Sequence, residues 1–249
     1  MLHSVIARHP AELRGALEVP PQTNEVGRSV ALLAGLFDVV ATTGVRRIRL
    51  LEVGASAGLN LHLDRFCFRG AGWAFGDRSS PVAFEEPIAG NVRVVPFAIA
   101  DRRGCDLHPV DAASSDGRLL LASFVWPFDV SRHQRLAAVL QVARRHPLSV
   151  EKAGAAAWLA EQLAGSGDEA LPVIWHSITQ LYWPATETAD VNAIMADYGA
   201  RHPLARVGME FGATAGTRPE LRSTVWQPGR GPLHRRLGTA DHHGPPVRT

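Results

Sequence analysis

Apolar residues recur along this chain with two different periods, and the change from one to the other marks the expected elements. Between Val26 and Val40 they return every three or four positions, which predicts a helix with one buried stripe. Ile48–Val53 is a short β-prone run, the small-residue turn Gly54–Gly58 follows at once, and Leu59–Phe66 has a helical pattern. Strand, turn and helix in this order predict the start of a βαβ unit.

The rest of the chain alternates in the same way. We expect further helices at Leu2–Glu18, Arg132–Arg145 (capped by Ser131), Ala155–Leu163 and Ala189–Tyr198, and further strands at Gly104–Leu107, Val173–His176, Leu204–Phe211 and Leu221–Trp226. Residues 70–104 are rich in Gly, Pro and Ser and lack helical periodicity, which predicts a β-rich insertion. From Gly229 the chain is polar and rich in Gly, Pro and His, which predicts a tail that is ordered only in part.

Alternating strands and helices indicate an α/β protein with a Rossmann-like fold, in which a mostly parallel sheet is flanked by helices. The chain has 249 residues, of which 46% are hydrophobic, so it can bury one large core. We expect residues 1–45 to form an N-terminal helical cap and residues 46–235 the α/β domain, with the insertion at 70–104. Residues 236–249 are expected to be a flexible C-terminal tail.

Composition excludes several classes of protein. A formal net charge of +2 is too small to indicate a nucleic-acid partner, and no apolar run approaches the roughly twenty residues that span a bilayer. The first twenty residues lack the apolar core of a secretory signal. Cys67 and Cys105 have no metal-ligand or redox spacing and predict reduced thiols in the cytoplasm. His242 and His243 stand alone in a Gly/Pro-rich stretch, so we expect no metal site.

Leu51–Asn60 (L-E-V-G-A-S-A-G-L-N) is the segment most informative about chemistry. A glycine-rich turn between a strand and a helix lets a ligand approach the backbone and directs N–H groups at it. With Glu52 before it, the turn resembles motif I of class I S-adenosylmethionine-dependent methyltransferases. That resemblance implies that Glu52, Gly54, Ser56 and Gly58 bind the methionine end of S-adenosylmethionine. Ser56 departs from the motif, which often has a glycine there.

The same turn also has the G-x-S-x-G pattern of an α/β-hydrolase nucleophile elbow, with Ser56 as the nucleophile. Only one predicted strand precedes the turn, no oxyanion segment of the His-Gly-Gly type comes before it, and Glu52 has no role in a hydrolase. A tight turn that binds no ligand is the third interpretation. The sequence therefore favours cofactor binding and keeps the other two open.

Several further segments carry a resemblance to a known family. They are Gln22–Arg28, Leu51–Asp64, Asp106–Asp111, Val125–Pro127 and His176-Ser177 with Tyr182. Together they resemble an uncharacterised bacterial (actinobacterial) family, the domain-of-unknown-function family 2332, over most of the chain. The family supplies no measured activity. What the resemblance implies, through motif I, is a Rossmann-like methyltransferase fold.

In that frame Asp106 ends the second strand, where an acid would bind the ribose hydroxyls of the cofactor. Asp77 fits the usual spacing of about twenty residues better but lies in a loop pattern, and the insertion would explain the longer gap to Asp106. Asn60 and Asp64 lie one helical turn apart. Asn60 is predicted to face the cofactor and Asp64 the substrate, unless both only bind a neighbouring loop.

One expected acid is missing. Relatives tend to have aspartates in the segment that corresponds to residues 151–160, where a carboxylate would face the adenine amino group. Here Gly154 and Ala157 stand at those places. The resemblance therefore implies weakened adenine recognition, or a different ligand.

His176 follows a buried run, so it is expected at the carboxyl end of a strand, where ligands of open α/β sheets bind. It is a candidate general base, and Tyr182 a candidate to orient the substrate; a core histidine and a packed tyrosine are the alternatives. Gln22, Asn24, Glu25 and Arg28 form a polar cluster that would close over the site, with Arg28 or Gln22 binding an acidic or amide substrate. The alternative is that Thr23 or Asn24 caps a helix.

The leading functional prediction is an S-adenosylmethionine-dependent methyltransferase that acts on a small molecule. The alternatives are a non-catalytic Rossmann-fold binding or scaffold protein and a serine hydrolase at Ser56. We expect a small-molecule substrate, no nucleic acid and no membrane, and the sequence leaves a homodimer open.

Overall fold

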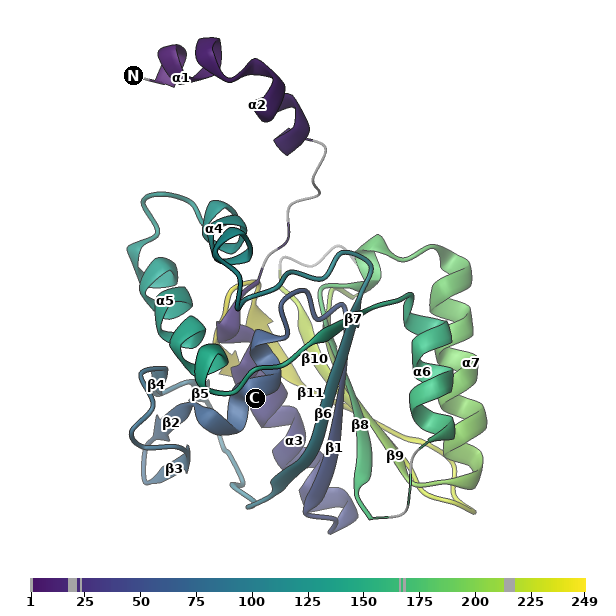
Figure 1. The fold of residues 1–249 in the computed structure, drawn as a ribbon. Helices are drawn as coiled ribbons and strands as arrows, with labels where there is room; N and C mark the ends of the chain where they lie inside the picture. Colours follow the sequence, from purple (N-terminus) through teal and green to yellow (C-terminus); the bar gives the residue numbers. More distant parts are fainter. Residues whose placement is uncertain (1, 18–21, 23, 166, 168, 213–217) are drawn as a thin grey trace.

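The computed structural model describes residues 2–17, 22, 24–165, 167, 169–212 and 218–249 (Figure 1). Its strands are β1 (Arg47–Val53), β2 (Cys67–Gly70), β3 (Trp73–Gly76), β4 (Ala83–Glu85), β5 (Ile88–Ala89), β6 (Ala98–Asp106), β7 (Val150–Lys152), β8 (Leu171–Ser177), β9 (Leu204–Glu210), β10 (Glu220–Trp226), β11 (Leu233–Asp241) and β12 (Gly244–Arg248). Its α-helices are α1 (Leu2–Arg8), α2 (Pro10–Leu17), α3 (Ser29–Thr43), α4 (Ser115–Ser123), α5 (Val130–Arg145), α6 (Ala155–Ala164) and α7 (Ala185–Arg201). Short 3-10 helices are η1 (Val26–Arg28), η2 (Leu59–Arg65) and η3 (Gln180–Tyr182).

Within the described residues the main sheet has nine strands, in the order β5-β12-β11-β10-β9-β8-β1-β6-β7. From β7 to β9 all neighbours are parallel, and β10, β11 and β12 continue the sheet as an antiparallel meander. A separate three-stranded sheet has the order β3-β2-β4. Figure 1 shows α6 and α7 on one face and α3 and α5 on the other. The predicted α/β class, with a large and mostly parallel sheet flanked by helices, is confirmed.

The central strands have buried apolar residues on both faces of the sheet, because helices cover both faces. Along β1, Ile48 and Leu50 belong to the core on the α3 side, whereas Leu51 and Val53 belong to the core shared with α6 and α7. This two-residue alternation directs Glu52 to the α3 side. The sheet thus divides the interior into two hydrophobic cores.

The helix α3 runs through the larger core. The span Val26–Thr43 is, among the described residues, long and apolar enough to cross a membrane by length and composition, and 72% of it is buried inside the protein. Its residues pack on β9, β10 and β12. Gly35 makes the closest approach, since a Cβ atom added there would lie 2.9 Å from Val207 Cγ2 and nearer still to Cγ1.

We therefore expect Gly35→Ala to lower the free energy of unfolding by about 1–3 kcal/mol, because overpacking outweighs the better helix propensity of alanine. Urea unfolding of the variant measures this. Gly15→Ala in α2 is the control, since a Cβ atom there meets nothing within 4 Å, and its stability should stay within about 1 kcal/mol of wild type. A Gly35→Ala protein as stable as the control would show that α3 can move away from β9 at no cost.

The two ends of the chain differ from expectation. The expected helix Leu2–Glu18 is two helices, α1 and α2, which lie apart from the sheet in Figure 1; residue 18 is outside the described residues. The remainder of the expected cap is α3, a core helix. The prediction of a flexible tail at 236–249 is wrong, because these residues continue β11 and form β12. Ala240 of β11 and Val247 of β12 are fully buried. The polar composition of this segment hid its two buried apolar positions.

Two smaller expectations are corrected as well. Residues 70–104 are β-rich as predicted, but the small sheet already begins at Cys67 and residues 98–104 belong to β6 of the main sheet. The helix after the insertion begins at Val130, and Asp129, not Ser131, caps it by accepting the N–H of Arg132. Cys67 is buried and unpaired, as is Cys105.

Candidate functional site

The strand order reverses between β1 and β8. From β1 the chain proceeds to β6 and then β7 on one side, whereas β8 and β9 follow on the other. In open α/β sheets such a reversal leaves a crevice at the carboxyl ends of the strands, and ligands bind there. The turn Gly54–Gly58 follows β1 at this edge, beside Asp106 at the end of β6 and Ser177 at the end of β8.

The turn has an unusual backbone. Gly54 and Gly58 have φ values of 70° and 68°, and Ser56 has 52°, a value that residues with a side chain seldom adopt. The N–H groups of Gly54 and Ala55 both donate to the Cys105 carbonyl, at 2.9 and 3.0 Å. The turn is therefore held against the end of β6 in a conformation that strained functional loops often have.

Asp106 is the acid that reaches the turn. Its Oδ2 accepts the Ser56 N–H at 2.8 Å, and its Oδ1 accepts the His108 N–H at 2.8 Å. Asp77, the alternative by spacing, instead accepts the N–H and hydroxyl of Ser79 in its own exposed loop. The structure thus brings Asp106 and Ser56 together and leaves Asp77 elsewhere.

Gln22 and Asn24 lie on the turn. Asn24 donates from Nδ2 to Ser56 Oγ at 2.7 Å and accepts the Ala57 N–H at 3.2 Å. The Ser56 hydroxyl donates to Gln22 Oε1, and Gln22 Nε2 donates to the His108 carbonyl at 2.8 Å. Ser56 is consequently only 9% exposed. Gln22 and Asn24 thus cover the glycine turn, whereas Glu25 of the same cluster caps η1 by accepting the Gly27 N–H.

Glu52 lies beneath the turn and is 3% exposed. The pKa of its carboxyl is raised to about 8, chiefly by burial and to a smaller extent by Asp106, against the opposing effects of hydrogen bonds from the Trp175 and Asn60 side chains and of the charge of Arg28. Among the described residues Glu52 Oε2, Asn60 Oδ1 and Trp175 Nε1 are buried without a hydrogen-bond partner. Three polar groups from three elements therefore meet here without hydrogen bonds of good geometry, at a cost that a ligand could remove.

Arg28 belongs to η1, and its buried guanidinium lies at the carboxyl end of β8. Its Nε donates to the His242 carbonyl at 3.0 Å and its Nη1 to the Ser177 carbonyl at 3.2 Å. It forms no ion pair with any residue that the structure describes. Burial lowers its pKa, and Glu25 and Glu210 raise it. Arg28 can thus offer charge to an acidic or amide group at this edge.

His176 has a different environment from the one a general base needs. Arg206 Nε donates to its Nε2 at 2.8 Å, so Nδ1 carries the proton and donates to Glu210 Oε1 at 2.7 Å. Burial and Arg206 lower its pKa, and the ring is 1% exposed. The imidazole is therefore neutral with both nitrogens engaged, which fits a hydrogen-bonded core histidine.

The other two predicted residues lie apart from the turn. Tyr182 is 76% exposed on η3. Asp64 on η2 binds Arg102 through both carboxylate oxygens, at 2.6 and 2.8 Å. Asp64 therefore joins η2 to β6 and is not free to bind substrate.

Two acids were missed in the sequence. Glu210 ends β9, and its Oε1 accepts from His176 and from the Thr179 N–H at 3.1 Å. An acid at the end of a buried strand was the available signal, as it was for Asp106. Glu187 on α7 accepts the Ala156 N–H at 2.9 Å and so supplies a carboxylate to the N-terminus of α6, beside Gly154. No local pattern indicates that contact, because it joins two helices.

A hydrolase site is not assembled at Ser56. Its side-chain partners are the amides of Gln22 and Asn24, no described histidine contacts it, and His176 points to the opposite face of the sheet. The part of the chain that the structure describes also holds no group of three or more His, Cys, Asp or Glu placed for a metal ion.

Comparison with known proteins finds one family. A family model described as "Uncharacterized protein conserved in bacteria (DUF2332)" matches residues 1–249. No curated protein and no solved structure matches the chain. The predicted family is confirmed, whereas an actinobacterial origin stays a prediction.

Proposed function

This chain belongs to the DUF2332 family of bacterial proteins, and we propose that it is an S-adenosylmethionine-dependent methyltransferase acting on a small molecule. The contact between Asp106 and the Ser56 N–H carries this proposal. It joins an acid at the end of the second parallel strand to the glycine turn after the first, at the reversal of strand order. Nucleotide cofactors bind at this place in doubly wound sheets.

The residues around the turn fit such a cofactor. Each oxygen of Asp106 accepts one backbone N–H and keeps a lone pair for a ribose hydroxyl. Glu52 and Asn60 have buried oxygens without partners, which suit the ammonium group at the methionine end. At the N-terminus of α6, Glu187 takes the place of the missing acid. Bound S-adenosylmethionine would supply the activated methyl group.

The chain's own contribution is binding and orientation. Gln22 and Asn24 must leave Ser56 to admit the cofactor, and they then can close over it. Arg28 holds an acidic or amide substrate at the end of β8, and the exposed Tyr182 contacts it from η3. His176 holds Glu210 and the β8–α7 connection in place, so the transfer relies on positioning rather than on His176 as a base.

We expect calorimetric titration of the wild type with S-adenosylmethionine and S-adenosylhomocysteine to show saturable binding. Asp106→Asn should weaken it about ten- to a hundred-fold, because a charge-assisted hydrogen bond to the ribose is lost. Asp101→Asn is the matched control on the same strand, since Asp101 forms an ion pair with Arg49 Nε at 3.0 Å, near the start of β1 and away from the turn at its end. Its affinity should equal that of wild type.

Circular dichroism establishes that each protein is folded. If the folded wild type binds neither compound, the methyltransferase proposal fails and a non-catalytic scaffold becomes the better interpretation. If both aspartate variants lose affinity equally, the cofactor does not contact Asp106.

A further inference from the structure

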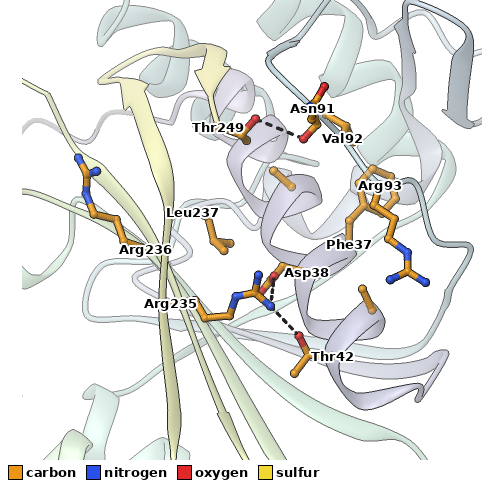
Figure 2. Close-up of a pocket in the computed structure, with 12 residues that line it drawn as sticks. Phe37, Asp38, Thr42, Asn91, Val92, Arg93, Arg235, Arg236, Leu237 and Thr249 are labelled. Carbon is orange, nitrogen blue, oxygen red and sulfur yellow. Dashed lines mark hydrogen bonds and ion pairs between the residues drawn. The ribbon is translucent and has the colours of Figure 1, made fainter.

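The core helix α3 has one stripe that the rest of the protein leaves uncovered. Most of its residues are fully buried, whereas Ala34, Asp38, Ala41 and Thr42 are only half-buried. Their spacing of three to four residues places them on one face. They form the floor of a cavity of about 500 Å³ (Figure 2). Because the two alanines are small, the floor leaves room where larger side chains would fill it.

The walls of this cavity come from distant parts of the chain. Arg235 and Leu237 of β11 stand on one side, and Asn91–Arg93 stand on the other (Figure 2). Phe37 forms an apolar wall whose ring is held edge-on by Trp73, Phe75 and Phe97. The cavity is therefore preformed, and apolar and polar groups share its lining.

The charges on the walls do not cancel. Asp38 accepts the Ser223 hydroxyl at 2.7 Å and pairs with Arg235 at 3.1 Å. Arg236 points to the other side of β11 in Figure 2, where it pairs with Glu220 at 3.0 Å. Arg93 is exposed and has no ion-pair or hydrogen-bond partner among the described residues. One unpaired positive charge thus borders the cavity.

The position is separate from the glycine turn. Thr42 lies near the end of α3, and the chain enters β1 only a few residues later, at Arg47. The cavity therefore lies toward the amino ends of the parallel strands, whereas the turn lies at their carboxyl ends. A ligand here would occupy a second site.

We propose that this cavity binds a small organic monoanion, a carboxylate on an apolar body. The carboxylate pairs with Arg93, and Arg235 adds a second donor from the facing wall. The apolar body lies against Ala34, Ala41 and Leu237, which line the cavity and are half-buried. A neutral molecule of the same size would leave Arg93 without a partner, so charge and apolar surface together define the ligand class.

The test is calorimetric titration of the full chain with octanoate and phenylacetate, which represent aliphatic and aromatic acids, and with 1-octanol as the uncharged match. We expect at least one acid to bind saturably and 1-octanol to bind at least ten-fold more weakly than octanoate. Arg93→Gln should weaken the acid about ten-fold or more. Arg230→Gln, which removes another exposed arginine in the β10–β11 turn, should leave it unchanged.

A second variant tests the volume. Ala41→Leu places a larger side chain on the floor and should abolish binding, with a thermal unfolding curve to establish that the protein is folded. No saturable binding of either acid to wild type overturns the proposal, as does equal binding of octanoate and 1-octanol. Equal losses in Arg93→Gln and Arg230→Gln overturn it too, and this comparison stands if Ala41→Leu does not fold.

Discussion

Replacing Glu25 with alanine is expected to lower the free energy of unfolding by about 3–5 kcal/mol. Glu25 is 3% exposed, and its carboxylate pairs with Arg132 Nε at 2.6 Å and Arg135 Nη1 at 2.5 Å. It also accepts the Gly27 N–H at 2.9 Å and so caps η1. Removing it leaves the buried Arg132 guanidinium without a counter-charge, which costs far more than the pair itself contributes.

Urea unfolding at neutral pH measures the effect. Glu85→Ala is the matched control, because Glu85 pairs with Arg69 on the surface and such pairs contribute about 0–1 kcal/mol. The double variant Glu25→Ala with Arg132→Ala removes both buried charges and should recover part of the loss. A Glu25→Ala protein that loses less than about 1 kcal/mol would mean that water reaches Arg132 in the folded state.

Replacing Glu52 with glutamine is expected to stabilise the protein, increasingly so as the pH rises. The folded pKa of Glu52, about 8, lies above its ordinary value of 4.5 because of burial. Between these values the folded protein keeps a proton that the unfolded chain releases, so the wild type loses stability as the pH rises through this window. Glutamine does not titrate. The advantage of Glu52→Gln should therefore grow by about 3 kcal/mol between pH 4.5 and pH 7.

The measurement is urea unfolding of both proteins at several pH values from 4.5 to 8. Glu12→Gln in α2 serves as the control, because that side chain is exposed and forms only a surface pair with His9, so the variant should stay within about 1 kcal/mol of wild type at each pH. A pH-independent difference for Glu52→Gln would mean that the folded carboxyl is ionised throughout. Under the proposed function the same variant binds S-adenosylmethionine less tightly, so stability and binding should change in opposite directions.

The pattern of apolar and polar residues within a segment was enough to predict the strands whose structure depends mainly on their own residues. The strands β1, β8, β9 and β10 lie within about two residues of their predicted ends, because each is a short β-prone run with several buried apolar positions. The glycine turn and the place of Asp106 followed from the same reasoning. Contacts between segments that are distant in the sequence gave no such signal. Glu187 of α7 contacts α6, and Arg206 of β9 contacts His176 of the neighbouring strand β8.

Periodicity within single segments was sufficient to predict the α/β class, the order of the central elements and the small-residue turn after β1. Which polar groups are free depends on the tertiary structure. It engaged both nitrogens of His176, tied Asp64 to Arg102, placed Asn24 on Ser56 and left Arg93 without a partner among the described residues. Whether a side chain is available for chemistry depends on neighbours that the fold brings from distant parts of the chain, and a pattern within one segment carries no information about them.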